Sequence, residues 1–144
     1  MHIHPYLFFN GRAEEALDFY KRAVGAEVTE LMRFKDGPET SPPGMVPKSW
    51  SDKVMHAIVR IGDTQLMASD GCSEEQLTFR GFSLSLAVTS ETEADRCFIA
   101  LADKGKVDMP LSKTFWSTRF GMVTDRFGVA WMICVFDDKT KGES

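Results

Sequence analysis

Residues 116–133, WSTRFGMVTDRFGVAWMI, decide the fold of this chain. The segment predicts a strand, a tight turn at residues 125–128 and a second strand. Gly128 stands where such a turn needs a positive φ, a conformation that costs glycine little. Large aromatic side chains flank the turn. The hairpin is therefore the most clearly predicted element, and the other strands and helices are assigned relative to it.

Upstream of the hairpin, the second half of the chain predicts a strand, a helix and a second strand. Residues 81–88 alternate apolar with small side chains, the period of two that is typical of a strand. Ser90 and Glu93 have the spacing of a capping box, and an apolar stripe over residues 94–102 predicts a helix that ends at Gly105. The remaining strands are expected at about 106–111, 118–124 and 129–136.

The first half of the chain repeats this order. Apolar residues recur at helical spacing from Ala13 to Val24, and Gly25 follows as a helix C′ glycine. The expected strands lie at about 3–9, 27–34, 54–61 and 64–69. Internal repetition constrains a fold more than any single motif does. We therefore predict a single α+β domain of two tandem βαβββ modules with curled, mixed or antiparallel sheets.

The module boundaries and the loops follow from composition. The first module is expected at about residues 1–70, the second at about 81–136, and the polar segment 71–80 is the expected linker. Residues 35–53 are rich in proline and glycine, which excludes regular structure. A loop of this length indicates either a lid or partner-contacting arm, or a connection without a role.

Charge, hydropathy and cysteine content exclude several functional classes. The net charge of −4 and the pI near 5.4 argue against a nucleic-acid partner, which needs a clustered basic surface. No apolar run approaches the roughly 18–20 residues that span a bilayer, so no membrane partner is expected. Cys72, Cys97 and Cys134 form no CxxC pair and indicate free thiols in a reducing cytoplasm.

Several sequence blocks, in order along nearly the whole chain, resemble the vicinal oxygen chelate superfamily. This superfamily is also called the glyoxalase, bleomycin-resistance and dioxygenase superfamily, and the chain is most similar to its PhnB-like, 3-demethylubiquinone methyltransferase-like branch. The blocks are residues 5–11 (PYLFFNG), 15–20 (EALDFY), 25–27 (GAE), 50–57 (WSDKVMHA), 61–63 (IGD), 69–71 (SDG) and 116–133. The resemblance implies modules that curl into half-cups with a site between sheets. We also expect a homodimer formed through paired or exchanged modules.

In metal-using members of that superfamily, histidines and carboxylates on the inward faces hold a divalent ion that chelates two substrate oxygens. The corresponding positions here carry His4 or Pro5 on the opening strand, Ser83 in the second module, and Met132 in place of the last-strand glutamate. The fourth position, near residues 66–68, offers no good ligand. Because thioether and apolar groups contribute little to a hard cation, we expect neither a family-type metal site nor a bound cofactor.

The favoured function is binding of a small molecule at a degenerate metal site. Aromatic side chains on the predicted strands would line a pocket for a flat or apolar ligand, with a few polar anchors. The expected contacts are His4, Phe8, His56, Trp116, Arg119 and Phe120, with Trp131 as a further aromatic. This assignment depends on register, because a slip of one residue moves every side chain to the other face.

Two other functions stay open, and with them the question of whether the protein is an enzyme. One is a divalent-metal-dependent lyase, isomerase or dioxygenase that acts on a small oxygenated substrate and recruits His4 and His56. The other is a structural or regulatory homodimer without a ligand, in which His56 serves as a hydrogen-bonded strand residue. Methyl transfer finds no support, because the chain lacks a strand, Gly-rich turn and helix for a nucleotide-like donor. Asp125 is expected to shape the hairpin turn, and Asp70 to belong to a turn.

Overall fold

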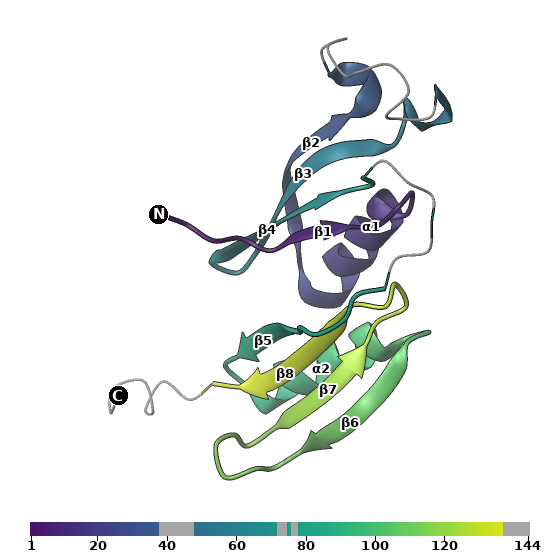
Figure 1. Ribbon diagram of the computed structural model, residues 1–144. Helices are drawn as coiled ribbons and strands as arrows, with labels where there is room; N and C mark the ends of the chain where they lie inside the picture. Colours follow the sequence, from purple (N-terminus) through teal and green to yellow (C-terminus); the bar gives the residue numbers. More distant parts are fainter. Residues whose placement is uncertain (38–47, 72–74, 76–77, 137–144) are drawn as a thin grey trace. The chain divides into compact units, whose positions relative to one another are not determined.

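Two four-stranded sheets, each with one α-helix, carry the strands predicted from the sequence (Figure 1). The computed structural model describes residues 1–37, 48–71, 75 and 78–136. The chain divides into two compact units, Met1–Leu77 and Thr78–Ser144. The order βαβββ occurs once in each unit, which confirms the predicted fold class.

In the first unit, one parallel and two antiparallel pairings build the sheet. Its elements are β1 (Tyr6–Phe8), α1 (Ala13–Val24), β2 (Glu27–Arg33), β3 (Val54–Ile61) and β4 (Thr64–Ser69), with 3₁₀ turns at Phe34–Asp36 and Lys48–Trp50. The strand order is β1-β4-β3-β2, with β1 parallel to β4. The predicted lid or arm falls largely on residues 38–47, outside the described residues.

The second unit repeats this topology with its own four strands. Its elements are β5 (Leu84–Val88), α2 (Glu91–Ala102), β6 (Lys106–Ser112), β7 (Phe120–Thr124) and β8 (Ala130–Val135), in the order β5-β8-β7-β6 with β5 parallel to β8. Helix α2 ends before the predicted Gly105, which has another role. A Cβ at Gly105 would collide with the carbonyl oxygen of Thr124, so only glycine permits this approach.

Each helix covers one face of the sheet in its own unit. In the first unit, Leu17 and Tyr20 of α1 are buried, as are Ala57, Val59 and Ala68 of the sheet. Successive strand residues point to opposite faces. The opposite face, here called the first open face, therefore carries Tyr6, Phe8, Met32, His56, Ile58 and Met67.

The second sheet has the same two-sided arrangement. Val123, Trp131 and Ile133 are buried on the side of α2, where Phe98 packs against Gly121. The opposite face, here called the second open face, carries Met109, Phe120, Met122, Met132 and Cys134. Within the described parts of the chain, neither open face is covered by an α-helix of its own unit.

The hairpin that joins β7 and β8 closes on Asp125, as predicted. Its buried carboxylate accepts hydrogen bonds from the backbone N–H groups of Phe127 (2.9 Å) and Val129 (3.0 Å) and from Nε1 of Trp131 (2.9 Å). Gly128 has a φ of 90°. Among the described residues, neither helix combines the length and the apolar character needed to cross a membrane.

Candidate functional site

A tyrosine–histidine pair lies on the first open face. The phenol oxygen of Tyr6 is 2.9 Å from Nδ1 of His56, and the two ring centroids are 5.7 Å apart. Tyr6 comes from β1 and His56 from β3, so the contact spans the intervening strand β4. Two residues 50 positions apart in the sequence thereby form one polar group on the sheet.

The pair can both donate and accept a hydrogen bond toward a bound molecule. Burial raises the pKa of Tyr6, against the smaller lowering effect of a hydrogen bond with Ser69. Tyr6 is therefore a neutral phenol at physiological pH. When the phenol donates to Nδ1, Nε2 of His56 carries the ring proton and can donate to a ligand; in the other tautomer Nε2 accepts.

Apolar side chains surround this polar pair. The ring of Phe8 lies 5.0 Å from that of Tyr6, and the exposed fraction of Phe8 is 46%. Met67 is the register partner of both Tyr6 and Ile58, and Met32 is the partner of His56. An apolar surface with a few polar anchors is the usual composition of a small-molecule site.

The remaining predicted contact of the first unit, His4, lies in the exposed segment before β1. Its ring stacks on that of His2, with centroids 6.0 Å apart and planes 7° from parallel. His56 instead bonds to Tyr6. The structure thus places the two histidines in separate interactions.

In the second unit, the structure brings two of the three predicted contacts together. The rings of Trp116 and Phe120 meet edge to face with centroids 5.4 Å apart. Trp116 is 56% exposed, whereas Phe120 is 8% exposed. Arg119 forms ion pairs with α2, at 3.3 Å to Asp95 and 3.9 Å to Glu91.

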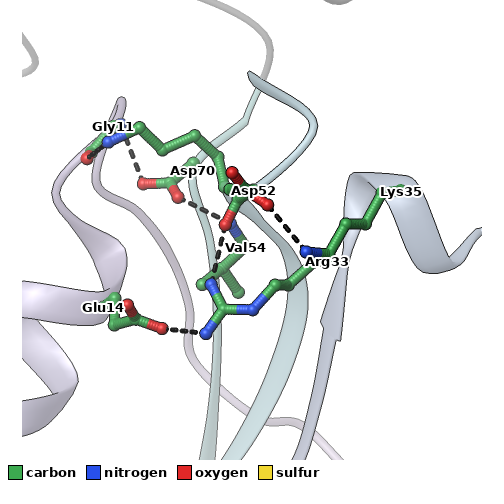
Figure 2. Close-up of a pocket in the computed structure, with 8 residues that line it drawn as sticks. Gly11, Glu14, Arg33, Lys35, Asp52, Val54 and Asp70 are labelled. Atoms are coloured by element: carbon green, nitrogen blue, oxygen red, sulfur yellow. Dashed lines mark hydrogen bonds and ion pairs between the residues drawn. The ribbon is translucent and has the colours of Figure 1, made fainter. Parts of the chain in front are cut away.

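The structure also contains a charged cavity of about 420 Å³ in the first unit, at the start of α1 and beside the ends of β2 and β3 (Figure 2). Its lining residues are Gly11, Glu14, Arg33, Lys35, Asp52, Lys53, Val54 and Asp70. Arg33 donates to the carboxylate of Glu14 and, at 2.7 Å, to the carbonyl oxygen of Asp52. Lys35 donates to the Asp52 carboxylate at 2.8 Å; this hydrogen bond raises the pKa of Lys35 and lowers that of Asp52. The charges around the cavity thus largely compensate one another.

Asp70 lines this cavity and connects three segments (Figure 2). Its carboxylate accepts hydrogen bonds of 2.8 Å from the backbone N–H groups of Gly11, Ala13 and Val54. The N-terminus of α1, which would otherwise attract an anion, is thereby occupied by a carboxylate of the protein. Sequence reasoning placed Asp70 in a turn and missed this role, because its partners lie up to 59 residues away.

The residues at the superfamily's metal positions do not fit a hard divalent ion. Met132 lies on the second open face with Met122 as its register partner. On β4, Leu66 and Ala68 are buried toward α1. Among residues 1–37, 48–71, 75 and 78–136, no three histidine, cysteine, aspartate or glutamate side chains gather as a site for such an ion would require.

Comparison with known proteins identifies relatives over nearly the whole chain. The model of a family described as 3-demethylubiquinone-9 3-methyltransferase matches residues 1–134. Protein YjdN of Escherichia coli (strain K12) is 37% identical over 142 residues, covering 94% of this chain and 95% of YjdN. Protein PA1353 from Pseudomonas aeruginosa is 45% identical, with a TM-score of 0.82 over 96% of this chain and 99% of that protein.

Two further solved structures extend the comparison. A putative 3-demethylubiquinone-9 3-methyltransferase, PhnB protein, from Bacillus cereus is 29% identical with a TM-score of 0.76, covering 94% of this chain and 100% of its own. A glyoxylase/bleomycin resistance protein/dioxygenase domain from Frankia sp. EAN1pec is 13% identical with a TM-score of 0.67, covering 94% of this chain and 96% of its own. At that identity the likeness concerns the fold alone, and it agrees with the tandem βαβββ arrangement.

Proposed function

The chain belongs to the 3-demethylubiquinone-9 3-methyltransferase family, and we propose that it binds a small organic molecule on the first open face. The single observation that carries this proposal is the 2.9 Å contact between Tyr6 and His56. This polar pair lies on an open face among exposed apolar side chains. It can therefore form hydrogen bonds with a bound ligand in addition to the contact within the pair. A ligand with one polar group and a flat apolar body would satisfy both parts of the surface.

The chemistry of the face defines the ligand class. The ring of Phe8 and the thioethers of Met32 and Met67 favour an aromatic or conjugated body, because methionine adapts its shape and contacts ring edges favourably. The Tyr6–His56 pair favours a carbonyl, carboxyl or hydroxyl group at one edge of the ligand. His4 is proposed as a further contact on the first unit. Trp116, Arg119 and Phe120 are proposed as contacts for a small molecule on the second unit, taken by itself.

The fold favours binding over methyl transfer from a nucleotide-like donor. Such donors are held by a doubly wound parallel sheet with a Gly-rich turn before a helix, whereas both sheets here are mixed and four-stranded. The corresponding helix N-terminus, that of α1, already holds the carboxylate of Asp70.

The proposal is tested by screening aromatic carboxylic acids, phenols and quinones for a shift in melting temperature, followed by titration of each hit. Tyr6→Phe removes the phenol and should weaken a hit about three- to tenfold, the value of one hydrogen bond. Phe8→Ala removes ring contact and should weaken the same hit. Ile99→Ala is the matched control, because Ile99 is apolar and 71% exposed on α2.

Three outcomes would contradict the proposal. Hits that bind Tyr6→Phe and Phe8→Ala as tightly as the unchanged protein would place the ligand elsewhere. Stabilisation by a stoichiometric divalent ion that is lost in His56→Ala would instead support the metal-dependent enzyme. If no compound or ion shifts the melting temperature, the structural or regulatory dimer gains support.

The homodimer and the cytoplasmic location are also proposed. Phe115 and Trp116 are 96% and 56% exposed, yet hydrogen bonds between Thr114 and Ser117 hold their turn, so these aromatic rings are preorganised for a partner. Burial raises the pKa of the free thiols of Cys97 and Cys134, consistent with stable thiols in a reducing compartment. Light scattering after size exclusion should give twice the chain mass, and Trp116→Ser should shift it toward the monomer. A monomeric mass for the unchanged protein would refute the dimer.

A further inference from the structure

Three methionines from three adjacent strands form a row on the second open face. Met109 of β6 is the register partner of Met122 of β7, and Met122 is the partner of Met132 of β8. Opposed Cα atoms in antiparallel strands lie roughly 5 Å apart, with their side chains on the same face. Register therefore makes the three methionines cross-strand neighbours on one face of the sheet. We call Met109, Met122 and Met132 the methionine row.

A β-bulge is what places Met109 in the row. Val107 pairs with Val123, whereas Met109 pairs with Met122, so the register shifts by one residue between them. Such a shift moves the following side chain to the other face. Val123 is buried on the side of α2, and Met109 consequently joins Met122 on the second open face.

The row is accessible from solvent. Met109 is 41% exposed, and Met122 and Met132 are half-buried. Cys134 lies on the same face, two residues beyond Met132, and is the register partner of Phe120. Figure 1 shows β8, β7 and β6 side by side, with α2 against one side of this sheet.

The chemistry of thioethers selects the kind of ion that the row can take. A thioether is uncharged and soft, a poor ligand for hard divalent ions and a good one for copper(I). The three rotatable bonds of methionine let the two outer sulfurs lean toward the central one. The same substitution that removes the superfamily's glutamate, Met132, thus supplies one of the three soft donors.

We propose that the methionine row binds a single soft monovalent metal ion, copper(I), through the sulfurs of Met109, Met122 and Met132. The site lies wholly in the second unit, on a different sheet from the Tyr6–His56 pair, and its test does not depend on ligand binding at that pair. Leucine has nearly the volume of methionine but lacks the sulfur atom. Methionine-to-leucine variants therefore test the thioether sulfurs and not the packing.

The test uses the full chain with [methyl-¹³C]methionine and titrates silver(I), a redox-stable probe for copper(I) sites. Of the eight methionines, the methyl signals of Met109, Met122 and Met132 should shift together and saturate at one equivalent. The protein should then compete with a chromogenic chelator for copper(I) at the same stoichiometry. Met122→Leu removes the central donor and should weaken silver(I) binding at least about tenfold.

Matched variants keep the test decisive. Met55→Leu, on β3 of the first unit, removes a methionine outside the row and should leave the affinity unchanged. Circular dichroism and melting temperature should show that the leucine variants are folded, since leucine conserves volume. Equal shifts of all methionine signals, or affinity lost in Cys134→Ser but kept in Met122→Leu, would overturn the proposal.

Discussion

The two units share one topology but anchor their helices differently. In the second unit, Oγ of Ser90 accepts a hydrogen bond of 3.1 Å from the backbone N–H of Glu93, so the cap of α2 is local. In the first unit, Arg12 stands at the corresponding position without a side-chain cap. Asp70, at the end of β4, takes that role through the N–H groups of Gly11 and Ala13.

The difference shows that the N-terminus of a helix can be capped by a neighbouring residue, as in α2, or by a residue distant in the sequence, as in α1. The first N–H groups of a helix need acceptors wherever the helix lies. Ser90 supplies an acceptor to α2 alone, whereas Asp70 also accepts from Val54 and so connects α1, β3 and β4. Removing Asp70 should therefore damage the first unit more widely than removing Ser90 damages the second.

The largest effect is expected for Asp70→Ala. The substitution leaves three backbone N–H groups, two of them buried, without their charged acceptor, and the free energy of unfolding should fall by about 3 kcal/mol or more. Chemical denaturation measures the loss, and hydrogen exchange should show it in α1 and the start of β3. Asp52→Ala is the control, because Asp52 is exposed and pairs with Lys35 at the surface. A loss below about 1 kcal/mol would refute the anchoring role of Asp70.

An intermediate effect is expected for Asp125→Ala. Asp125 also accepts three hydrogen bonds, but two main-chain bonds between its backbone and residues 128 and 129 (2.9 and 2.8 Å) survive the change. The free energy of unfolding should fall by about 2 kcal/mol. Trp131 loses its Nε1 partner, so tryptophan fluorescence should change in the folded state. A loss larger than that of Asp70→Ala would reverse the proposed ranking.

The smallest effect is expected for Ser90→Ala. Loss of an N-cap costs about 1 kcal/mol, and Ser90→Gly should cost only a few tenths. Faster hydrogen exchange should be confined to the first turn of α2. Exchange that also accelerates in β5 or β8 would show that this cap, too, supports more than its own helix.

Much of this architecture could be predicted from the sequence because its signals are local. Gly25 has a φ of 69° and caps α1 as expected, and the strands at 54–61 and 64–69 lie where period and turn residues put them. The end of α2 was predicted wrongly at Gly105. That glycine is required by close approach to β7, a contact that no sequence pattern reports.

The candidate site was less predictable, because its side chains come from strands that are far apart in the sequence. His56 was identified from its residue type, but its partner Tyr6 is 50 positions away on another strand. Met132 was recognised as a replacement for glutamate, yet strict alternation along β6 would place Met109 on the same side as Val107. The bulge reverses that side, so the methionine row could not be derived from periodicity.

The sequence by itself determined the two βαβββ modules and the family, because these depend on short-range pattern and residue identity. Tertiary structure alone decided the anchoring by Asp70, the pairing of Tyr6 with His56 and the alignment of three methionines. Each of these joins residues from different strands or segments. Their distances are set by sheet register, and a shift of one residue in register changes which side chains meet.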